Sequence, residues 1–159
     1  TKISLAKFLE DALTYSGEKN ITRKKLQDLG NLWREMHGSG VLGRKAAEYI
    51  QEKKLTKVVV EGFRNIGEIE EIQKTGNFTL IALLVNRSIR YKRLVKLKRR
   101  EKLTQELFEK LDYRDMGIGE KETGLQVAVC IAIADIFLEN NKTEKDLFKK
   151  LEKTARGLE

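Results

Sequence analysis

A carboxylate and an arginine stand three positions apart in the run VVVEGFRN, where they are Glu61 and Arg64. The β-branched residues at 57–60 predict a short buried strand, and Gly62 lets the backbone turn after it at little steric cost. Such a strand delivers Glu61 to its carboxyl end, and Arg64 can offer a forked pair of donors to a phosphate. A structural ion pair between the two side chains is the alternative, and the spacing alone leaves both open.

A second group of cations lies in the run NRSIRYKRLVKLKRREK, which predicts a basic helix over about residues 88–102. Arg90 and Arg93 are three positions apart and therefore share one helix face, which Arg100 continues. A row of arginines can supply the positive charge that phosphoryl transfer needs around its oxygens. For the lysines of this helix, a solvated basic face is the preferred interpretation.

The run GSGVLGRK at residues 38–45 has the glycines of a phosphate-binding loop but not its other residues. The motif G-x-x-x-x-G-K-S/T follows a strand, whereas here Arg44 takes the lysine position, Lys45 takes the Ser/Thr position, and a predicted helix precedes the run. We therefore expect a helix-to-helix turn. The single His37 and the single Cys130 have no partners at metal-ligand spacing, so the sequence predicts no zinc site and no disulfide.

The hydrophobic pattern sets the elements that must position these residues. The first third of the chain has helical periodicity, and strands alternate with helices after it. This order predicts an α/β fold with a parallel sheet flanked by helices. Because ligands bind such sheets beyond the carboxyl ends of the strands, we expect the site just after Val60, Val85 and Leu138. The predicted helices are 4–15, 22–37, 41–53, 66–74, 88–102, 104–112, 123–134 and 143–156, and the predicted strands are 57–60, 78–85 and 136–138.

Composition narrows the class of protein. A chain of 159 residues without a low-complexity linker predicts one domain over residues 1–159, and 40% apolar with 35% charged residues argues against disorder and against a membrane protein. The most apolar stretch, 127–138, is too short to span a bilayer, and no signal-like segment opens the sequence, so we expect a cytoplasmic protein. The net charge of +8 favours an anionic partner, with a ligand-free basic surface as the alternative.

Several runs resemble nucleotide kinases. VVVEGFRN is similar to the D-G-F-P-R segment of adenylate kinases and the D-G-I/V-R segment of related kinases, and TLIALLVNRSIRYKRL resembles the next strand and its arginine-bearing helix. DYRDMGIGEKETGLQVAVCIAIADIFLENNKTEKDL and ITRKKLQDLGNLWREMHGSGVLGRKAAEYI resemble a narrower group of archaeal and phage nucleotide-kinase-like proteins. That group is close to dephospho-coenzyme A kinases and also occurs fused to deoxycytidylate deaminases. The resemblance covers nearly all of the chain from Ile3.

The resemblance implies a P-loop NTPase core of the nucleoside-monophosphate-kinase type, with Mg²⁺ and ATP as cofactors in the intact family and a nucleoside monophosphate or related nucleotide as partner. In that family the acidic residue helps to hold magnesium-bound water, one arginine binds the acceptor phosphate, lid arginines surround the transferred group, and a loop lies near the donor base. The matching positions here are Glu61 for the acid, Arg64 for the acceptor phosphate, Arg90 and Arg93 with Arg99 or Arg100 for the lid, and Asn140 and Asn141 for the loop.

The departures from the family pattern decide the expected activity. The first strand, its glycine-rich loop and its lysine have no counterpart, and KISLAKFL resembles the segment after that first unit. We therefore expect a nucleotide-binding, kinase-like domain with negligible kinase activity, because the loop's amides and lysine are not replaced by the arginines. A sheet lacking a strand is also expected to leave an edge that favours a homo-oligomer.

Two other function classes stay open. The chain could be a non-catalytic nucleotide sensor or the accessory module of a nucleotide deaminase, although the H-x-E and P-C-x-x-C elements of zinc deaminases are absent from it. Nucleic-acid binding through the basic helix ranks third, because Tyr91 is the only aromatic residue in that run for base stacking.

Overall fold

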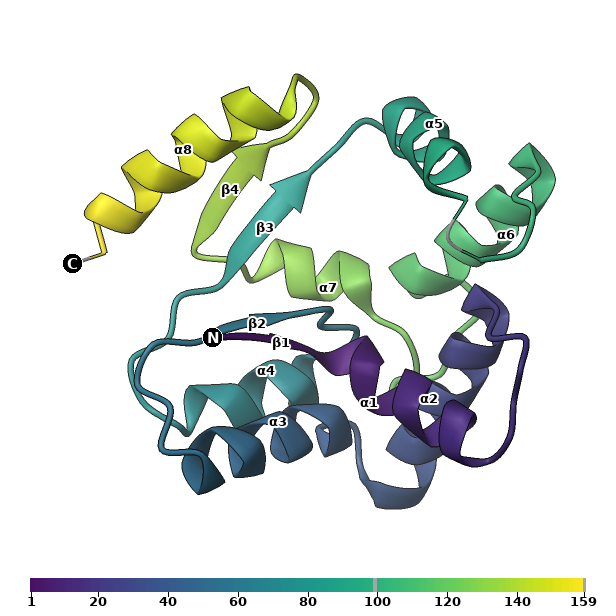
Figure 1. Cartoon of the computed structure of the whole chain (residues 1–159), viewed down its shortest axis with the longest axis horizontal. Coiled ribbons are helices and arrows are strands. Elements are labelled where there is room, and N and C mark those ends of the chain that lie inside the picture. The colour runs from purple at the N-terminus through teal and green to yellow at the C-terminus, as the bar shows by residue number, and fades with distance from the viewer. Residues whose placement is uncertain (99, 159) are drawn as a thin grey trace.

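The structure is a computed structural model that describes residues 1–98 and 100–158. Short parallel strands alternate with helices, which confirms the predicted α/β class (Figure 1). No helix in this described part of the chain has the length and apolarity needed to cross a membrane. In chain order the elements are β1 (Lys2–Ser4), α1 (Leu5–Tyr15), α2 (Arg23–His37), α3 (Val41–Glu52), β2 (Val59–Glu61), α4 (Ile66–Gln73), β3 (Ile81–Leu84), α5 (Arg87–Leu97), α6 (Gln105–Met116), α7 (Val127–Ala132), β4 (Ile136–Glu139) and α8 (Glu144–Arg156).

The strands form two separate parallel pairs rather than the single sheet expected from the sequence. β1 pairs with β2, with Ile3 opposite Val60, and β3 pairs with β4, with Leu83 opposite Leu138. Within the described residues, β2 and β3 are not hydrogen-bonded to each other, so each of these strands has one open edge. In Figure 1 the pair β3 and β4 lies above the pair β1 and β2 and runs obliquely to it.

Local signals placed most helix ends correctly. The Thr22 hydroxyl accepts a hydrogen bond from the Lys25 amide at 3.2 Å, and Thr143 forms a capping box with Asp146, as expected for helix starts. The predicted helix over 88–102 was too long, since α5 ends at Leu97. Lys98 adopts a left-handed conformation with φ of 45°, which stops the helix without a glycine.

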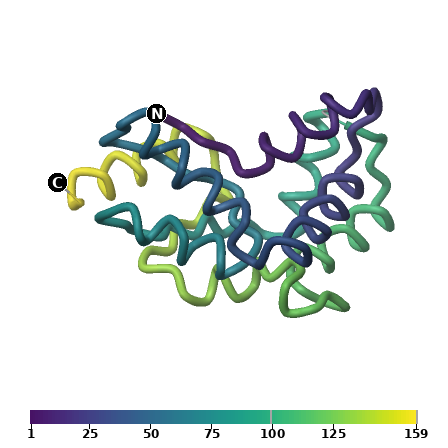
Figure 2. The backbone as a smooth tube through the Cα atoms, turned by 90° about the horizontal axis from the view of Figure 1, so that it is seen from below, coloured from purple at the N-terminus to yellow at the C-terminus, as the bar shows by residue number. Residues whose placement is uncertain are grey.

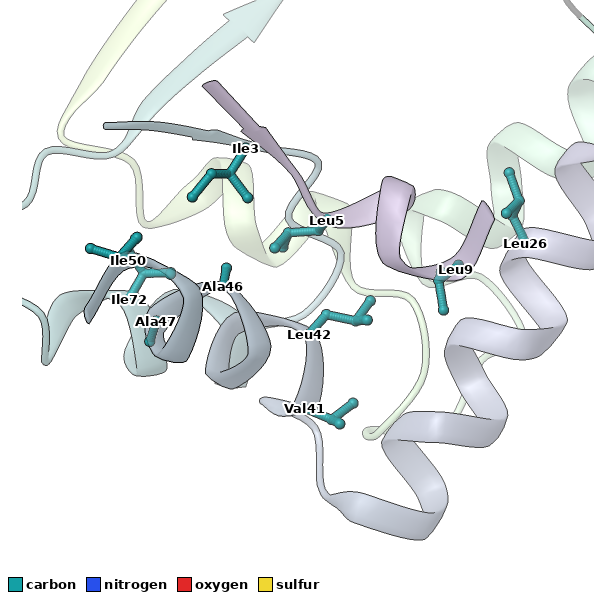
Figure 3. Packing of buried hydrophobic residues seen from close by; sticks show 10 residues of the cluster. All are labelled: Ile3, Leu5, Leu9, Leu26, Val41, Leu42, Ala46, Ala47, Ile50 and Ile72. Atoms are coloured by element: carbon teal, nitrogen blue, oxygen red, sulfur yellow. The ribbon is translucent and has the colours of Figure 1, made fainter. Parts of the chain in front are cut away.

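The strand β1 was not predicted. Lys2, Ile3 and Ser4 do not form a periodic apolar run, and they become a strand because β2 supplies main-chain partners: the Val59 amide donates to the Thr1 carbonyl at 2.8 Å. Ile3 then reaches the main hydrophobic cluster, which joins this strand to the helices around it (Figure 3). The buried members of this cluster are Ile3, Leu5, Leu9, Leu26, Val41, Leu42, Ala46, Ala47, Ile50 and Ile72.

Glycines allow the close packing of α3 against α4. A Cβ added at Gly43 would lie 2.7 Å from Glu68 Cα, and one at Gly40 would lie 2.7 Å from the Gly67 carbonyl oxygen. The glycine-rich run at 38–45 therefore has a packing role: it forms the turn from α2 into α3, and its glycines let α3 approach α4 closely. This confirms the expected helix-to-helix turn.

The helices α5 and α6 lie at the same end of the molecule as α1 and α2, whereas α8 and both termini lie at the other (Figures 1 and 2). Ionic contacts link α1 and α2 to α6 and to the residues that flank α6. Arg114 pairs with Asp28 at 2.8 Å, Lys121 pairs with Glu35 at 2.9 Å, and Arg100 pairs with Glu10. The candidate site lies at the end of the molecule formed by α1, α2, α5 and α6.

Candidate anion-binding site

Two buried carboxylates on α6 organise the site. Asp112 and Asp115 are three residues apart and so lie on one face of the helix, and each side chain is only 3% exposed. The helix that carries them is fixed at its start by the Thr104 hydroxyl, which accepts the Leu107 amide at 3.2 Å, and at its end by Gly117 in a left-handed conformation. Buried carboxylates require cationic partners, and arginines from three other parts of the chain supply them.

Asp115 receives arginines from α2 and from the segment after β2. Arg23, the first residue of α2, donates to Asp115 Oδ2, and Nη1 of Arg64 lies 3.6 Å from the same oxygen. The side-chain amide of Gln27 donates to Asp115 Oδ1 at 2.9 Å. Arg64, a residue predicted from the sequence, therefore meets a carboxylate that the sequence did not indicate.

Asp112 receives the arginines of α5. Arg87 Nε and Arg90 Nη2 donate to the same Asp112 oxygen, at 3.0 Å and 2.7 Å. The Arg87 guanidinium also lies 4.4 Å from the ring centroid of Tyr113. This cation–π contact helps to fix the orientation of the guanidinium. We refer to Arg23, Arg64, Arg87 and Arg90, with Asp112 and Asp115, as the arginine cluster.

The cluster has more positive charge and more donors than its carboxylates use. Four guanidiniums face two carboxylates. Nη1 of Arg23, Nη2 of Arg87 and Nε of Arg90 are buried and donate to no oxygen of the described residues. An unsatisfied buried donor costs about 1–3 kcal/mol, so an anion that accepted hydrogen bonds from these atoms would be stabilised.

The arginines lower the pKa of Asp115, the carboxylate that they surround. Burial by itself would raise the pKa of Asp115, but the charges of Arg64 and Arg23 and the hydrogen bonds to Asp115 outweigh it, and the pKa lies below 3.8. Asp115 is thus ionised near neutral pH and keeps the arginines in place, while the excess positive charge stays available.

A buried ion pair fixes the segment that carries Arg64. Arg34 Nε donates to Glu68 Oε1 at 2.8 Å, and Glu68 Oε2 accepts the Arg64 amide at 2.7 Å. Asn65 caps α4 and also donates to the carbonyls of Glu122 and Gly124, at 2.9 Å and 2.8 Å. The main chain at Arg64 is therefore held from three sides, which gives the arginine a defined position.

Other residues predicted as site residues have different partners. Glu61 pairs with Lys2 at 3.1 Å rather than with Arg64, and both Glu61 and Lys2 are largely exposed. Arg93 donates to the carbonyls of Asn140 and Lys142, each at 2.7 Å, so it braces the segment after β4.

Arg100 pairs with Glu10 on α1 and is not part of the cluster, and Arg99 lies outside the described residues. Asn141 accepts the Asn86 amide at 2.7 Å, and the Asn140 amide donates to the Leu84 carbonyl at 2.7 Å. The two asparagines therefore tie the end of β4 to the end of β3.

The sequence interpretation missed Asp112, Asp115 and Arg23 as members of a site. The i, i+3 spacing of the two aspartates on a predicted helix was a usable signal, but their burial depends on tertiary packing. Arg23 gave no local signal, since it lies among the lysines of the α2 start.

A depression elsewhere on the molecule does not suit an anion. It has a volume of about 780 Å³, and its lining includes the carboxylates of Glu70 and Glu122 together with Asn65 and Gln126. None of the four arginines of the cluster lines it. Charge therefore favours the arginine cluster as the anion site.

The described residues do not by themselves form a ready-made metal site. They contain no group of three or more His, Cys, Asp or Glu side chains close enough to share a metal, and the Glu61 carboxylate is paired with an ammonium group. What the arginine cluster can do chemically is to donate hydrogen bonds to an anion.

Comparison with known proteins identifies relatives of this chain. No protein-family model matches it. It is 33% identical over 136 residues to a UPF0200 protein of Sulfurisphaera tokodaii, an alignment that covers 85% of this chain and 72% of the relative. It is also 29% identical over 120 residues to a UPF0200 protein of Hyperthermus butylicus and 27% identical over 134 residues to one of Saccharolobus solfataricus.

These alignments leave part of each relative without a counterpart, since the chain spans 61% of the length of the Hyperthermus protein and 68% of that from Saccharolobus. The match to the Sulfurisphaera protein nevertheless extends over most of both chains at substantial identity. The chain therefore belongs to the UPF0200 protein family.

Proposed function

We propose that this chain is a nucleotide-binding domain of the monophosphate-kinase type, which binds the phosphate group of a nucleotide at the arginine cluster and does not itself transfer phosphate. The observation that carries the proposal is the set of three buried guanidinium nitrogens, on Arg23, Arg87 and Arg90, that have no acceptor among the described residues.

The position of the cluster supports this function. Arg64 follows β2, and Arg87 and Arg90 follow β3, so these arginines come from segments after the carboxyl ends of parallel strands. That is the edge at which α/β sheets bind ligands. Guanidinium groups suit phosphate because their paired donors match two phosphate oxygens at once.

The proposal includes the finer fold assignment, a P-loop kinase core that lacks its first strand, loop and helix. The four strands of the described part of the chain run parallel to their partners, and β2 and β3 each keep an open edge. A parallel core interrupted between its second and third strands is consistent with a missing central strand. The resemblance of VVVEGFRN to the acidic segment of nucleotide kinases supports the same assignment.

Phosphoryl transfer is not proposed for this chain. Mg²⁺ and ATP are cofactors of the family that it resembles, but the Glu61 carboxylate is paired with Lys2 and no lysine-bearing phosphate loop follows a described strand. We expect no turnover of ATP by the purified chain. A measurable rate that disappeared in Arg64→Ala would refute this part of the proposal.

The binding function can be tested by thermal unfolding with nucleoside mono-, di- and triphosphates and with dephospho-coenzyme A. A ligand at about a hundred times its Kd adds roughly 2.7 kcal/mol of stability, which shifts the melting temperature clearly. We expect a shift with one class of nucleotide that Arg64→Ala and Arg90→Ala each greatly reduce, with every variant compared with its own ligand-free melting temperature.

Arg156→Ala is the matched control, because Arg156 is an exposed arginine on α8 at the far end of the molecule (Figure 1). It should keep the full shift. If no nucleotide shifts any form of the protein, or if Arg156→Ala removes the shift as strongly as Arg64→Ala does, the cluster is not a nucleotide site. An accessory role beside a deaminase would then be the better hypothesis.

A further inference from the structure

Two aromatic rings of α6 lie against the same arginine of the cluster. The Arg87 guanidinium lies 5.6 Å from the ring centroid of Phe108 and 4.4 Å from that of Tyr113. Phe108 is a core residue that is only 2% exposed, whereas Tyr113 is 46% exposed. Arg87 therefore connects a ring in the interior to a ring that solvent reaches.

The hydrogen bonds of Arg87 leave one of its nitrogens for a ligand. Its Nε donates to Asp112 at 3.0 Å, and its Nη1 donates to the Tyr113 hydroxyl at 3.3 Å. Its Nη2 is buried and donates to no oxygen of the described residues. A phosphate that accepts a hydrogen bond from Nη2 would thus bind a guanidinium that also contacts Tyr113, and the tyrosine ring would be a neighbour of the bound ligand.

The exposed part of the Tyr113 ring suits a flat aromatic group. Bases stack on tyrosine rings, because every base has a π-face. Other aromatic side chains in the described part of the chain are also exposed, namely Tyr15, Tyr49, Phe137 and Phe148. Within the described residues, none of those rings lies against a guanidinium of the cluster, so Tyr113 is the exposed ring best placed to hold a base beside the phosphate.

We propose that Tyr113 recognises the base of the ligand: a purine stacks on its exposed ring while the phosphate accepts hydrogen bonds from Arg87 Nη2 and Arg90 Nε. This inference rests on the proposed function and names the ligand class, a purine nucleotide. A purine is favoured because its two fused rings cover more of a tyrosine ring than a single pyrimidine ring does, and preferences among stacked bases follow stacking strength.

A tyrosine that only orients Arg87 is the alternative to this role. In that case the Tyr113 hydroxyl would matter, since it accepts the hydrogen bond from Arg87 Nη1. Stacking requires the ring and not the hydroxyl. Tyr113→Phe keeps the ring and removes the hydroxyl, whereas Tyr113→Leu removes both, so the two variants separate the roles.

The test is calorimetric titration of the full 159-residue chain with AMP, GMP, UMP and ribose 5-phosphate. These compounds share a phosphate on a ribose and carry a purine, a pyrimidine or no base. We expect the native protein to bind one of the purine nucleotides about tenfold or more tightly than ribose 5-phosphate, with UMP between them. Tyr113→Leu should reduce the affinity for that purine nucleotide to the affinity for ribose 5-phosphate, which should not change. Tyr113→Phe should keep the preference for the purine.

Tyr49→Leu is the matched control. Tyr49 is a tyrosine of similar exposure, 41%, on α3, which carries no residue of the cluster. The variant should keep the native preference, and circular dichroism checks that every variant is folded. As a second measurement, NMR of the native protein should show that the purine nucleotide shifts the ring signals of Tyr113 upfield and that ribose 5-phosphate does not. The signals of Tyr113 are assigned by their loss in Tyr113→Phe.

Three outcomes would overturn the inference and leave the proposed function intact. Ribose 5-phosphate could bind as tightly as the purine nucleotides, UMP could bind most tightly, or Tyr113→Leu could weaken all four compounds by the same factor. The last result would show that Tyr113 acts only through Arg87. If none of the four compounds binds the native protein, the proposed function fails together with the inference.

Discussion

The guanidinium of Arg34 on α2 and the carboxylate of Glu68 on α4 form an ion pair of 2.8 Å in the interior, where the two side chains are 1% and 0% exposed. The second oxygen of Glu68 accepts the Arg64 amide. A pair between two helices thus fixes the main chain of a residue in the arginine cluster, and the structural core and the candidate site are directly connected.

Replacement of Arg34 should be costly. In Arg34→Met the Glu68 carboxylate would stay buried without its cation, and breaking such a pair destabilises a protein by about 3–5 kcal/mol. Urea unfolding measures the change. The control is Lys24→Met on the same helix, where the side chain is 62% exposed and its pair with Asp28 should contribute no more than about 1 kcal/mol. Equal losses in the two variants would show that the buried pair has no special weight.

Gly43 should not tolerate a side chain. The Cβ of alanine there would lie 2.7 Å from Glu68 Cα, which is main chain and cannot rotate away. Gly43→Ala should therefore separate α3 from α4 and reduce the free energy of unfolding by about 1–3 kcal/mol. Gly157→Ala is the matched control, because the nearest atom to its Cβ would be 3.4 Å away and its φ is −83°. A neutral Gly43→Ala would contradict the observed helix contact.

Arg90 and Arg93 should differ although they were predicted as a pair. Arg90 donates to Asp112 and has a buried nitrogen without an acceptor among the described residues, whereas Arg93 donates to the carbonyls of Asn140 and Lys142. We expect Arg93→Ala to lower the melting temperature but to keep the nucleotide-induced shift, and Arg90→Ala to lose that shift. Calorimetric titration of the two variants with the active nucleotide checks this, and equal affinities would contradict the assignment.

Asp115 should make stability depend on acid pH. Its pKa in the folded protein is below 3.8, the value for an ordinary aspartate, so its contribution to stability is fully present above 3.8 and is lost as the pH falls through the folded pKa. The stability difference between the native protein and Asp115→Asn should therefore shrink as the solution becomes more acidic than that value. Urea unfolding across this range measures it, and Asp11→Asn at an exposed pair is the control. A difference that grows with acidity would have the wrong sign.

Cys130 should be unreactive in the native protein. Burial first, and the negative charge of Glu68 second, raise the pKa of its thiol from 9.0 to about 11, and the residue is 6% exposed. Because thiolate is the reactive form, alkylation by iodoacetamide near pH 8 should be slower than that of a free thiol by about a hundredfold or more. The thiol should react fully in urea, so mass spectrometry can use it to report unfolding. Rapid native labelling would show that α7 opens readily.

The local elements and the class of the fold could be predicted from the sequence. Thr22 and Thr143 indicated helix starts because a cap acts within one helical turn. The apolar runs at β3 and β4 indicated strands because the hydrophobic pattern of a strand, alternating or continuous, is complete within a few residues. The order of strands and helices was enough to expect arginines beyond the strand ends, and Arg64 and Arg90 do meet neighbouring carboxylates there.

The partners of these residues depend on the tertiary structure. Asp112 and Asp115 became the centre of the cluster because packing buried them against α2 and α5, and Glu61 took Lys2 rather than Arg64 because β1 lies beside β2. The division of the sheet into two pairs was also hidden from the sequence. Strand neighbours and ion-pair partners are set by contacts between residues far apart in the chain, whereas periodicity and caps report only on residues a few positions apart.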